Sequence, residues 1–216
     1  LLIADLETRA EEARFPWRST TIESVNASSP VVFDDLVYVS HSIRDKGVMM
    51  RVSAAGGVET VWTNRSLGAY WMTPVHYEGY LYGFDGRQAT EAKIVCLDVR
   101  TGEEKWRTMP WWEETVLVDG LAREQTARIA RGHLLWVDGA FLCLGEFGQL
   151  CWLALRPDGC EVLQRATLFH AQQTYAPPIL SHGLLYVSQN EPSVIDGSPQ
   201  RLLCYDLRGT SSEFEP

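Results

Sequence analysis

The chain has 216 residues, of which 45% are hydrophobic and 22% are charged, a composition typical of a globular protein. This composition excludes a disordered chain, a collagen-like chain and a coiled coil. No apolar run approaches the roughly 20 residues that a membrane helix needs. The formal net charge is −9 and the basic residues are scattered, so the basic patch of a nucleic-acid binder is missing. Eight Trp, eight Tyr and 17 Gly among short Val, Ile and Leu runs favour strands joined by tight turns.

A unit that reads strand, two-residue turn, strand recurs four times along the chain. In three of the copies the second turn residue is Gly, which supplies the positive φ that tight hairpins need. The first and third steps between copies are 44 residues, and the middle step is 60, so an insertion precedes the third copy. The copies cover residues 30–39, 74–83, 134–143 and 178–187, with turns at Asp34-Asp35, Glu78-Gly79, Asp138-Gly139 and His182-Gly183.

A second element follows each hairpin, and its best copy runs from Cys96 to Trp106. Asp98, at the end of a strand, can accept hydrogen bonds from backbone N–H groups of the following turn, which Thr101 and Gly102 make. Trp106 then begins the next strand, and its large ring is expected to pack between repeats. Partial copies occur at residues 3–8, 51–62, 152–159 and 203–209, the last of which contains Asp206.

Four strands per unit of about 44 residues is typical of a propeller blade. We therefore predict an all-β chain that forms a partial β-propeller of about four blades, each with four antiparallel strands. An insertion at 107–130 belongs to the third blade, and Leu121 to Ile129 is expected to form a short helix. Residues 1–17 are expected to be the last strand of a preceding blade, so that 1–216 is one domain. The predicted blades cover about 18–62, 63–106, 107–165 and 166–210.

The pattern Cys96-x-Asp98-x-x-Thr101-Gly102-x-x-x-Trp106 resembles the tryptophan-docking motif of pyrroloquinoline-quinone-type propellers, with Cys96 in place of the family's Ala. The segment 79–86 is similar to bacterial quinoprotein-like repeats. This family includes quinone-dependent alcohol dehydrogenases. It also includes cofactor-free members, such as the propeller lipoprotein of the outer-membrane barrel-assembly machinery. Because family members close with more than four blades, the resemblance implies a C-terminal fragment of a larger propeller, from the lipoprotein-like branch.

The resemblance also implies what a quinone enzyme of this family would need. It would carry an adjacent pair of cysteines against the quinone, and Glu and Asn ligands for Ca²⁺ beside a catalytic Asp. No two cysteines of this chain are adjacent, so no catalytic residue, cofactor or metal is expected here. PQQ and calcium belong only to the alternative that the catalytic blades lie outside this segment. The five cysteines are Cys96, Cys143, Cys151, Cys160 and Cys204.

The positions of the cysteines and histidines suggest structural roles. Cys96 and Cys204 are equivalent in their repeats and are expected to be small core residues. Cys143 and Cys151 flank a predicted hairpin, so they would face each other and could form a disulfide in an exported protein. The five histidines are scattered without the spacing of metal ligands, and we expect them to be solvated or hydrogen-bonded.

Two groups of aromatic and polar residues are candidates for a binding site. The first is Trp111-Trp112-Glu113 in the insertion, because loops carry function more often than scaffold strands do. Packing between blades is the alternative for these two Trp rings. The second group lies before or within the innermost strands, which line the central channel of a propeller, and consists of Tyr70, Trp71, Gln173 and Tyr175.

The sequence therefore indicates a non-catalytic scaffold that binds a protein, peptide or polymer on a propeller face. The resemblance implies a periplasmic or cell-envelope location, and the remaining blades of a longer chain as partners. One alternative is a quinone-dependent alcohol or sugar dehydrogenase. A carbohydrate-binding propeller is a third reading, which rests on the aromatic residues alone.

Overall fold

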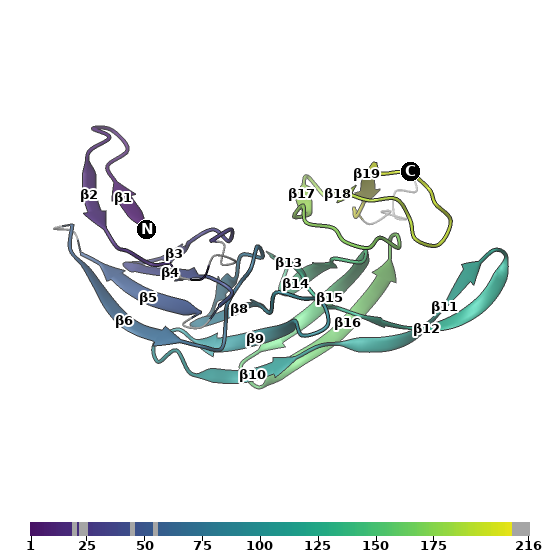
Figure 1. Ribbon diagram of the computed structural model, residues 1–216, viewed down its shortest axis with the longest axis horizontal. Coiled ribbons are helices and arrows are strands. Elements are labelled where there is room, and N and C mark those ends of the chain that lie inside the picture. The colour runs from purple at the N-terminus through teal and green to yellow at the C-terminus, as the bar shows by residue number, and fades with distance from the viewer. Residues whose placement is uncertain (19–20, 22–25, 44–45, 54–55, 209–216) are drawn as a thin grey trace, which may run out of the picture.

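The computed structural model describes residues 1–18, 21, 26–43, 46–53 and 56–208. All regular elements among these residues are β-strands, and every strand pairing is antiparallel (Figure 1). The predicted all-β fold class is therefore confirmed. The strands are β1 (Leu2–Ala4), β2 (Glu11–Arg14), β3 (Val31–Phe33), β4 (Leu36–Ser40), β5 (Gly47–Val52), β6 (Val58–Asn64), β7 (Val75–Tyr77), β8 (Tyr80–Asp85), β9 (Lys93–Asp98), β10 (Glu104–Thr108), β11 (Trp111–Val118), β12 (Leu121–Arg128), β13 (Gly132–Val137), β14 (Ala140–Gly145), β15 (Gln149–Arg156), β16 (Gly159–Thr167), β17 (Ile179–Ser181), β18 (Leu184–Gln189) and β19 (Arg201–Asp206).

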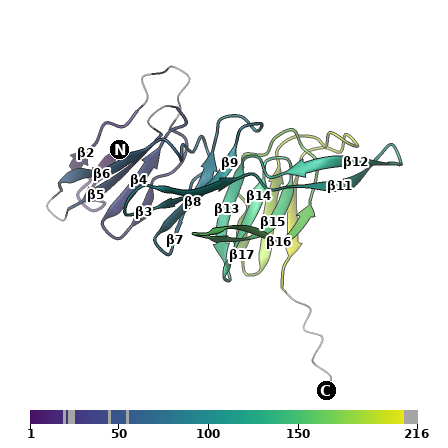
Figure 2. The same ribbon diagram turned by 90° about the horizontal axis from the view of Figure 1, so that it is seen from below.

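The sheets follow one another in chain order as the blades of a partial propeller. Three sheets have four strands in the order β3-β4-β5-β6, β7-β8-β9-β10 and β13-β14-β15-β16, and we call them blades 1, 2 and 3. A three-stranded sheet, β17-β18-β19, is blade 4. Figures 1 and 2 show the blades side by side in an open arc, with β6 and β10 on its convex side and β3, β13 and β17 toward its concave side.

The tight turns form where the repeats predict them. Four non-glycine residues at the first turn position have positive φ, between 46° and 52°. This conformation is uncommon outside Gly, Asn, Asp and His, and the hairpin twist requires it. The first turn residues are Asp34, Glu78, Asp138 and His182.

The insertion is a long hairpin, and the helix predicted over Leu121 to Ile129 is wrong. β12 pairs with β11 along eight residue pairs, from Trp111↔Arg128 to Val118↔Leu121. The turn is Asp119-Gly120, and both of its residues have positive φ. Cross-strand pairing satisfies the backbone here and overrides the helical propensity of the segment.

The two ends of the arc differ from the expected strand counts. Residues 1–17 hold two paired strands, β1 and β2, where we expected one strand. The turn between them resembles the repeat turns, since Asp5 Oδ1 accepts hydrogen bonds from the backbone N–H of Glu7 (2.9 Å) and Thr8. Blade 4 has three strands among the described residues, where we expected four.

Each junction between neighbouring sheets holds its own hydrophobic core. Alternate residues of a strand serve opposite junctions, as the period of two in a β-strand dictates. In β9, Cys96 belongs to the core between blades 2 and 3, and Val95 and Leu97 belong to the core between blades 1 and 2. Stability therefore depends on contacts between nearest neighbours, as in other repeat proteins.

The outer strands of blades 1 and 2, β6 and β10, each carry a tryptophan that hydrogen-bonds to the next blade. Trp62 Nε1 donates to the carbonyl oxygen of Val99 at 2.8 Å, and Trp106 Nε1 donates to that of Arg156 at 2.7 Å. Val99 lies in the turn after β9, the third strand of blade 2, and Arg156 is the last residue of β15, the third strand of blade 3. In blade 2 this turn is held by Asp98, whose Oδ1 accepts a hydrogen bond from the N–H of Arg100 at 2.8 Å.

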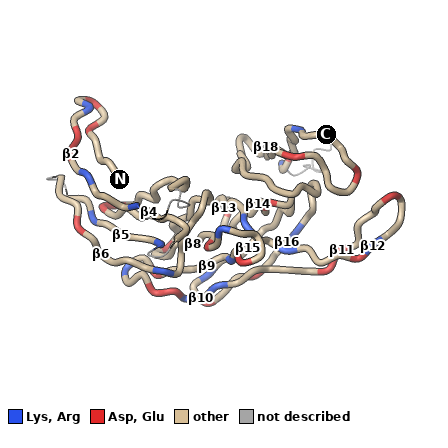
Figure 3. The backbone as a smooth tube through the Cα atoms, viewed as in Figure 1, with Lys and Arg blue, Asp and Glu red and all other residues tan. Residues whose placement is uncertain are grey.

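Charged residues of both signs are interspersed along the backbone (Figure 3). Among the described residues no helix has the length and apolarity that crossing a bilayer requires.

The five cysteine side chains are free thiols in different surroundings. Cys143 and Cys151 are register partners on β14 and β15, and both are buried, so their predicted face-to-face placement is confirmed without a disulfide. Cys96 is buried, as expected. Cys204 is exposed, against expectation, because no sheet of the described residues covers that face of β19.

These surroundings predict a simple thiol titration. Burial raises the pKa of Cys96 and Cys160 to about 11 and that of Cys151 to about 12, which disfavours the reactive thiolate. With Ellman's reagent at neutral pH, the native chain is expected to show one fast-reacting thiol, that of exposed Cys204. After unfolding without reductant, all five thiols should react. If only three thiols react after unfolding, the other two cysteines form a disulfide.

Candidate functional site

Aromatic rings from three blades meet in one pocket at the concave side of the arc. The pocket has a volume of about 440 Å³. Trp71 comes from the loop before β7, His133 from the start of β13, and Tyr175 from the loop before β17. The ring centroids of Trp71 and His133 are 4.9 Å apart, and those of Trp71 and Tyr175 are 5.1 Å apart at an interplanar angle of 74°. We call this the inner pocket.

Part of the inner pocket repeats one position of the blade. Trp71, Arg131 and Tyr175 each lie three residues before the residue that begins the repeated unit, namely Pro74, Leu134 and Pro178. In blade 1 the same position is Ala27, which also lines the pocket. The repeat therefore aims one side chain per blade at the same region, and large rings occupy two of the positions.

A buried ion pair between Arg131 and Glu146 contacts the rings of Trp71 and Tyr175. Arg131 and Glu146 have side-chain exposures of 11% and 1%, and Arg131 Nη2 lies 2.6 Å from Glu146 Oε2. Arg131 Nη1 also donates to the carbonyl oxygen of Arg87 at 2.6 Å. The guanidinium carbon is 5.8 Å from the ring centroid of Trp71 and 5.9 Å from that of Tyr175. These distances are in the range of cation–π contacts, so the ion pair fixes both rings.

Polar groups hold Tyr175 and its loop in place. The Tyr175 hydroxyl donates to Gln173 Oε1, and Gln173 Nε2 donates to Glu191 Oε1 at 2.7 Å. His133 Nε2 lies 2.8 Å from the carbonyl oxygen of Tyr175, which makes this nitrogen the donor. Burial lowers the pKa of His133, although the bond to Tyr175 opposes the shift, so the imidazole is neutral at pH 7.

The Trp71 ring, which lines the inner pocket, carries a buried donor that the chain does not satisfy. The Trp71 Nε1–H is buried and has no hydrogen-bond partner. Such a group is costly and rare in folded proteins. With its flat rings and few polar atoms, the pocket is suited to noncovalent binding.

The sequence candidates therefore fall into two separate places. Trp71, Gln173 and Tyr175 come together at the inner pocket. Tyr70 packs partly buried against the core between blades 2 and 3, with the guanidinium carbon of Arg87 5.8 Å from its ring centroid.

The other candidates lie in the β11–β12 hairpin, away from the inner pocket. Trp111 is 64% exposed, whereas Trp112 is 6% exposed and belongs to the core between blades 2 and 3. Glu113 Oε1 accepts a hydrogen bond from the Thr126 hydroxyl across the hairpin at 2.9 Å. Packing therefore explains Trp112, and Trp111 is left as an exposed ring on a projecting hairpin.

Glu114, which the sequence placed beside Glu113 as a possible ligand contact, instead ties the hairpin to blade 3. Its carboxylate accepts hydrogen bonds from Thr167 at 2.9 Å and Gln125 at 2.9 Å. Burial raises the pKa of Glu114, but these bonds and one from Trp112 outweigh it, and the net shift is downward. The hairpin base is thus anchored by a carboxylate that stays ionised.

Sequence reasoning also missed Arg131 and His133. The signal that could have found Arg131 is the shared repeat position, because it stands where Trp71 and Tyr175 stand. The described part of the chain holds no group of three or more His, Cys, Asp or Glu side chains placed to bind a metal ion.

Comparisons with known proteins give a weak likeness in structure. No family model matches the chain, and no curated protein matches it significantly in sequence. Among solved structures, the crystal structure of BamB from Moraxella catarrhalis superposes with a TM-score of 0.47 at 14% sequence identity. The match covers 82% of this chain and 41% of that chain, so the chain spans less than half of the BamB length. The fold assignment rests on the chain's own sheets and their order.

Proposed function

We propose that the chain is a non-catalytic binding module that binds an extended protein segment at the inner pocket. The observation that carries the proposal is the meeting of Trp71, His133 and Tyr175 from three blades around one pocket. Trp, Tyr and Arg are the residue types that dominate binding energy at protein interfaces. A cluster of these types, held rigid by the Arg131–Glu146 pair, loses little conformational entropy on binding.

A protein segment suits the pocket because of its mixed chemistry. The ring faces accept apolar side chains, and the lining also includes the polar residues Ser29 and Thr73. Concave faces of repeat proteins are also common binding surfaces for extended ligands. A location in the cell envelope is part of the proposal, and its support is the quinoprotein-like repeat motif from Cys96 to Trp106.

The alternative of a quinone-dependent dehydrogenase finds no fitting residues here. The five cysteines include no adjacent pair, and the described residues include no group of three or more His, Cys, Asp or Glu side chains placed to hold a metal ion. We therefore propose no cofactor, and we derive no chemical step through a quinone.

A displayed peptide library, selected on the immobilised chain, tests the proposed function. We expect enriched peptides to bind the wild-type chain in calorimetry, and Tyr175→Ala to weaken this binding by about tenfold or more, as for an interface hot spot. Tyr175 is 42% exposed, so its removal should leave the fold intact.

Trp111→Ala is the matched control, because Trp111 is an exposed ring on a different element. It should leave the affinity unchanged. Equal binding by wild type and Tyr175→Ala would refute the inner pocket as the site. A loss confined to Trp111→Ala would move the binding site to the hairpin.

A further inference from the structure

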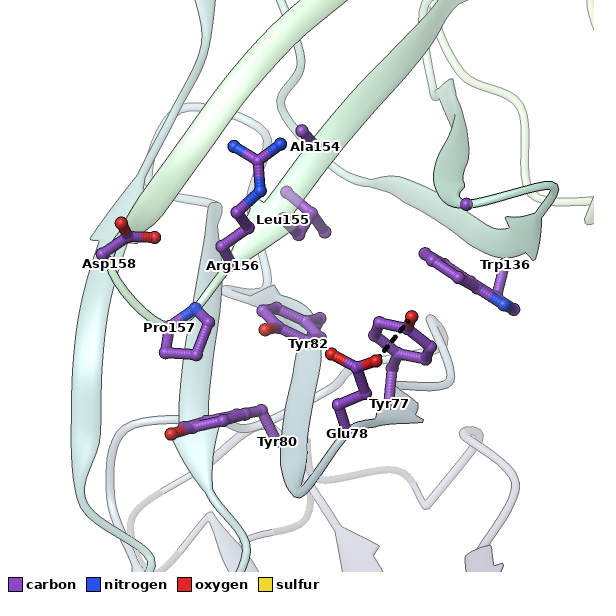
Figure 4. Close-up of a pocket in the computed structure, with 11 residues that line it drawn as sticks. Tyr77, Glu78, Tyr80, Tyr82, Trp136, Ala154, Leu155, Arg156, Pro157 and Asp158 are labelled. Atoms are coloured by element: carbon purple, nitrogen blue, oxygen red, sulfur yellow. Dashed lines mark hydrogen bonds between the residues drawn. The ribbon is translucent and has the colours of Figure 1, made fainter.

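A second pocket lies at the junction of blades 2 and 3, at the other end of the innermost strands. It has a volume of about 400 Å³. Blade 2 contributes Tyr77, Tyr80 and Tyr82, and blade 3 contributes Trp136 and the turn between β15 and β16. Figure 4 shows these rings around the pocket, with the side chains of Arg156, Pro157 and Asp158 along its opposite edge. We call it the junction pocket.

The junction of blades 1 and 2 provides an internal comparison. There a Cβ on Gly102 would lie 2.7 Å from the ring of Trp62, so that ring fills the space against the turn. At the junction of blades 2 and 3, Gly159 is the first residue of β16 and lacks the positive φ of Gly102, and a Cβ on it would meet nothing within 4 Å. Both tryptophans make the same hydrogen bond, but only Trp62 packs on its glycine. The residues just before Gly159, namely Arg156, Pro157 and Asp158, line the junction pocket.

The rings of the junction pocket also differ from those of its counterpart. Both junctions contain one stacked pair of rings. The ring centroids of Tyr77 and Trp136 are 3.7 Å apart at the junction of blades 2 and 3. Those of Phe33 and His76 are 3.8 Å apart at the junction of blades 1 and 2. Tyr80, however, stands where the preceding repeat has Leu36. Its ring centroid lies 6.4 Å from that of Tyr82, at an interplanar angle of 43°. The substitution adds an aromatic wall where the other junction has an aliphatic residue.

The charged groups at the junction pocket are mostly acidic. The Glu78 carboxylate lies between the rings of Tyr77 and Tyr82 (Figure 4), and it accepts a hydrogen bond from the Tyr77 hydroxyl at 3.0 Å. Asp158 is the second carboxylate of the lining. Arg156 is the one cation of the lining, and its guanidinium lies 3.8 Å from Glu161.

From these observations we propose that the junction pocket binds an alkylammonium group. Aromatic ring faces attract cations through their quadrupole, and recognition of quaternary ammonium groups by aromatic cages is the best-known use of this attraction. The carboxylates of Glu78 and Asp158 add a favourable field, and the net charge of −9 attracts cations over longer range. The same chemistry occurs in free choline-like compounds and in the lysine side chain.

Titration of the ¹⁵N-labelled chain with choline tests the proposal by following the indole N–H signals of Trp106 and Trp136. We expect saturable shifts at about 1–10 mM, as for a ligand of few atoms. The uncharged isostere 3,3-dimethylbutan-1-ol should give no saturable shift. Nα-acetyl-lysine amide distinguishes the sources, because tighter binding than choline would point to a lysine side chain of a protein.

Three variants locate the site. Tyr80→Leu restores the residue of the preceding repeat, so it should fold, and it should weaken choline binding by about five- to thirtyfold. Glu78→Gln should weaken binding at least about fivefold, and Arg156→Gln should strengthen it by removing a like charge. Tyr175→Ala, at the inner pocket, should have no effect.

Three results would overturn the proposal. One is binding of the uncharged isostere as tight as that of choline, which would show a merely apolar cavity. Another is a set of saturable shifts with methyl α-glucoside and none with choline, which would assign the pocket to saccharides. Unchanged choline affinity in both Tyr80→Leu and Glu78→Gln would place the cation elsewhere.

Discussion

Replacing Trp106 by alanine is expected to lower the free energy of unfolding by about 3–5 kcal/mol, the range for a large aromatic residue packed in a core. The ring packs against the core between blades 2 and 3, and its centroid lies 6.1 Å from that of Tyr82. The substitution also removes the bond from Nε1 to the carbonyl oxygen of Arg156. Because each blade is stabilised by its neighbours, weakening one junction weakens the cooperative unit.

Urea denaturation followed by circular dichroism measures this effect, with two variants for comparison. Trp106→Phe keeps most of the packing but loses the hydrogen bond, and should cost about 1–2 kcal/mol. Trp111→Ala removes an exposed ring and should change stability by less than about 0.5 kcal/mol. A loss below about 1 kcal/mol in Trp106→Ala would show that this ring does not hold the two blades together.

Local signals made the repeat architecture predictable from the sequence. The turn at Glu78-Gly79 and the Asp98 turn depend on residues within a few positions of each other, and their φ angles and hydrogen bonds follow from those residues. Strand alternation then sends Val95 and Cys96 to opposite junctions. These features require no knowledge of distant partners.

The errors arise where distant contacts decide the structure. The segment from Leu121 has residues that favour a helix, but pairing with β11 fixes it as a strand. Cys204 matches Cys96 in the repeat, yet only Cys96 has a neighbouring blade on its face. A repeat alignment predicts which side of a strand a residue occupies, and it does not predict what covers that side.

The candidate sites show the same division. Trp71 and Tyr175 were predictable because aromatic residues before two innermost strands point to the channel side of a propeller. Arg131 occupies the same repeat position in the third blade, and it was missed because the search looked only for aromatic residues. The junction pocket could not be predicted, because its lining combines Tyr77, Tyr80 and Tyr82 of blade 2 with Trp136 and the β15–β16 turn of blade 3, which lie far apart in the sequence.

Glu146→Ala is expected to cost about 3–5 kcal/mol, because it leaves the charge of Arg131 buried without a partner. Glu146 Oε1 and Oε2 accept hydrogen bonds from the Arg131 Nε at 3.1 and 3.0 Å, and Oε1 also accepts one from the Arg131 backbone N–H at 3.1 Å. All of these groups lose their acceptor together. The loss should also loosen Trp71 and Tyr175, which the guanidinium contacts, and so weaken peptide binding at the inner pocket.

A double-mutant cycle separates the buried charge from the loss of packing. Glu146→Leu alone should destabilise the chain about as much as Glu146→Ala does, since the arginine is stranded in both. Adding Arg131→Met should recover a large part of the loss, because an apolar pair of similar volume replaces a buried ion pair at little cost. The coupling energy follows from the unfolding free energies of four proteins: the wild type, Glu146→Leu, Arg131→Met and the double variant. A double variant less stable than Glu146→Leu would contradict this account, and would mean that Arg131 holds the loops through Arg87 and the two rings independently of its carboxylate.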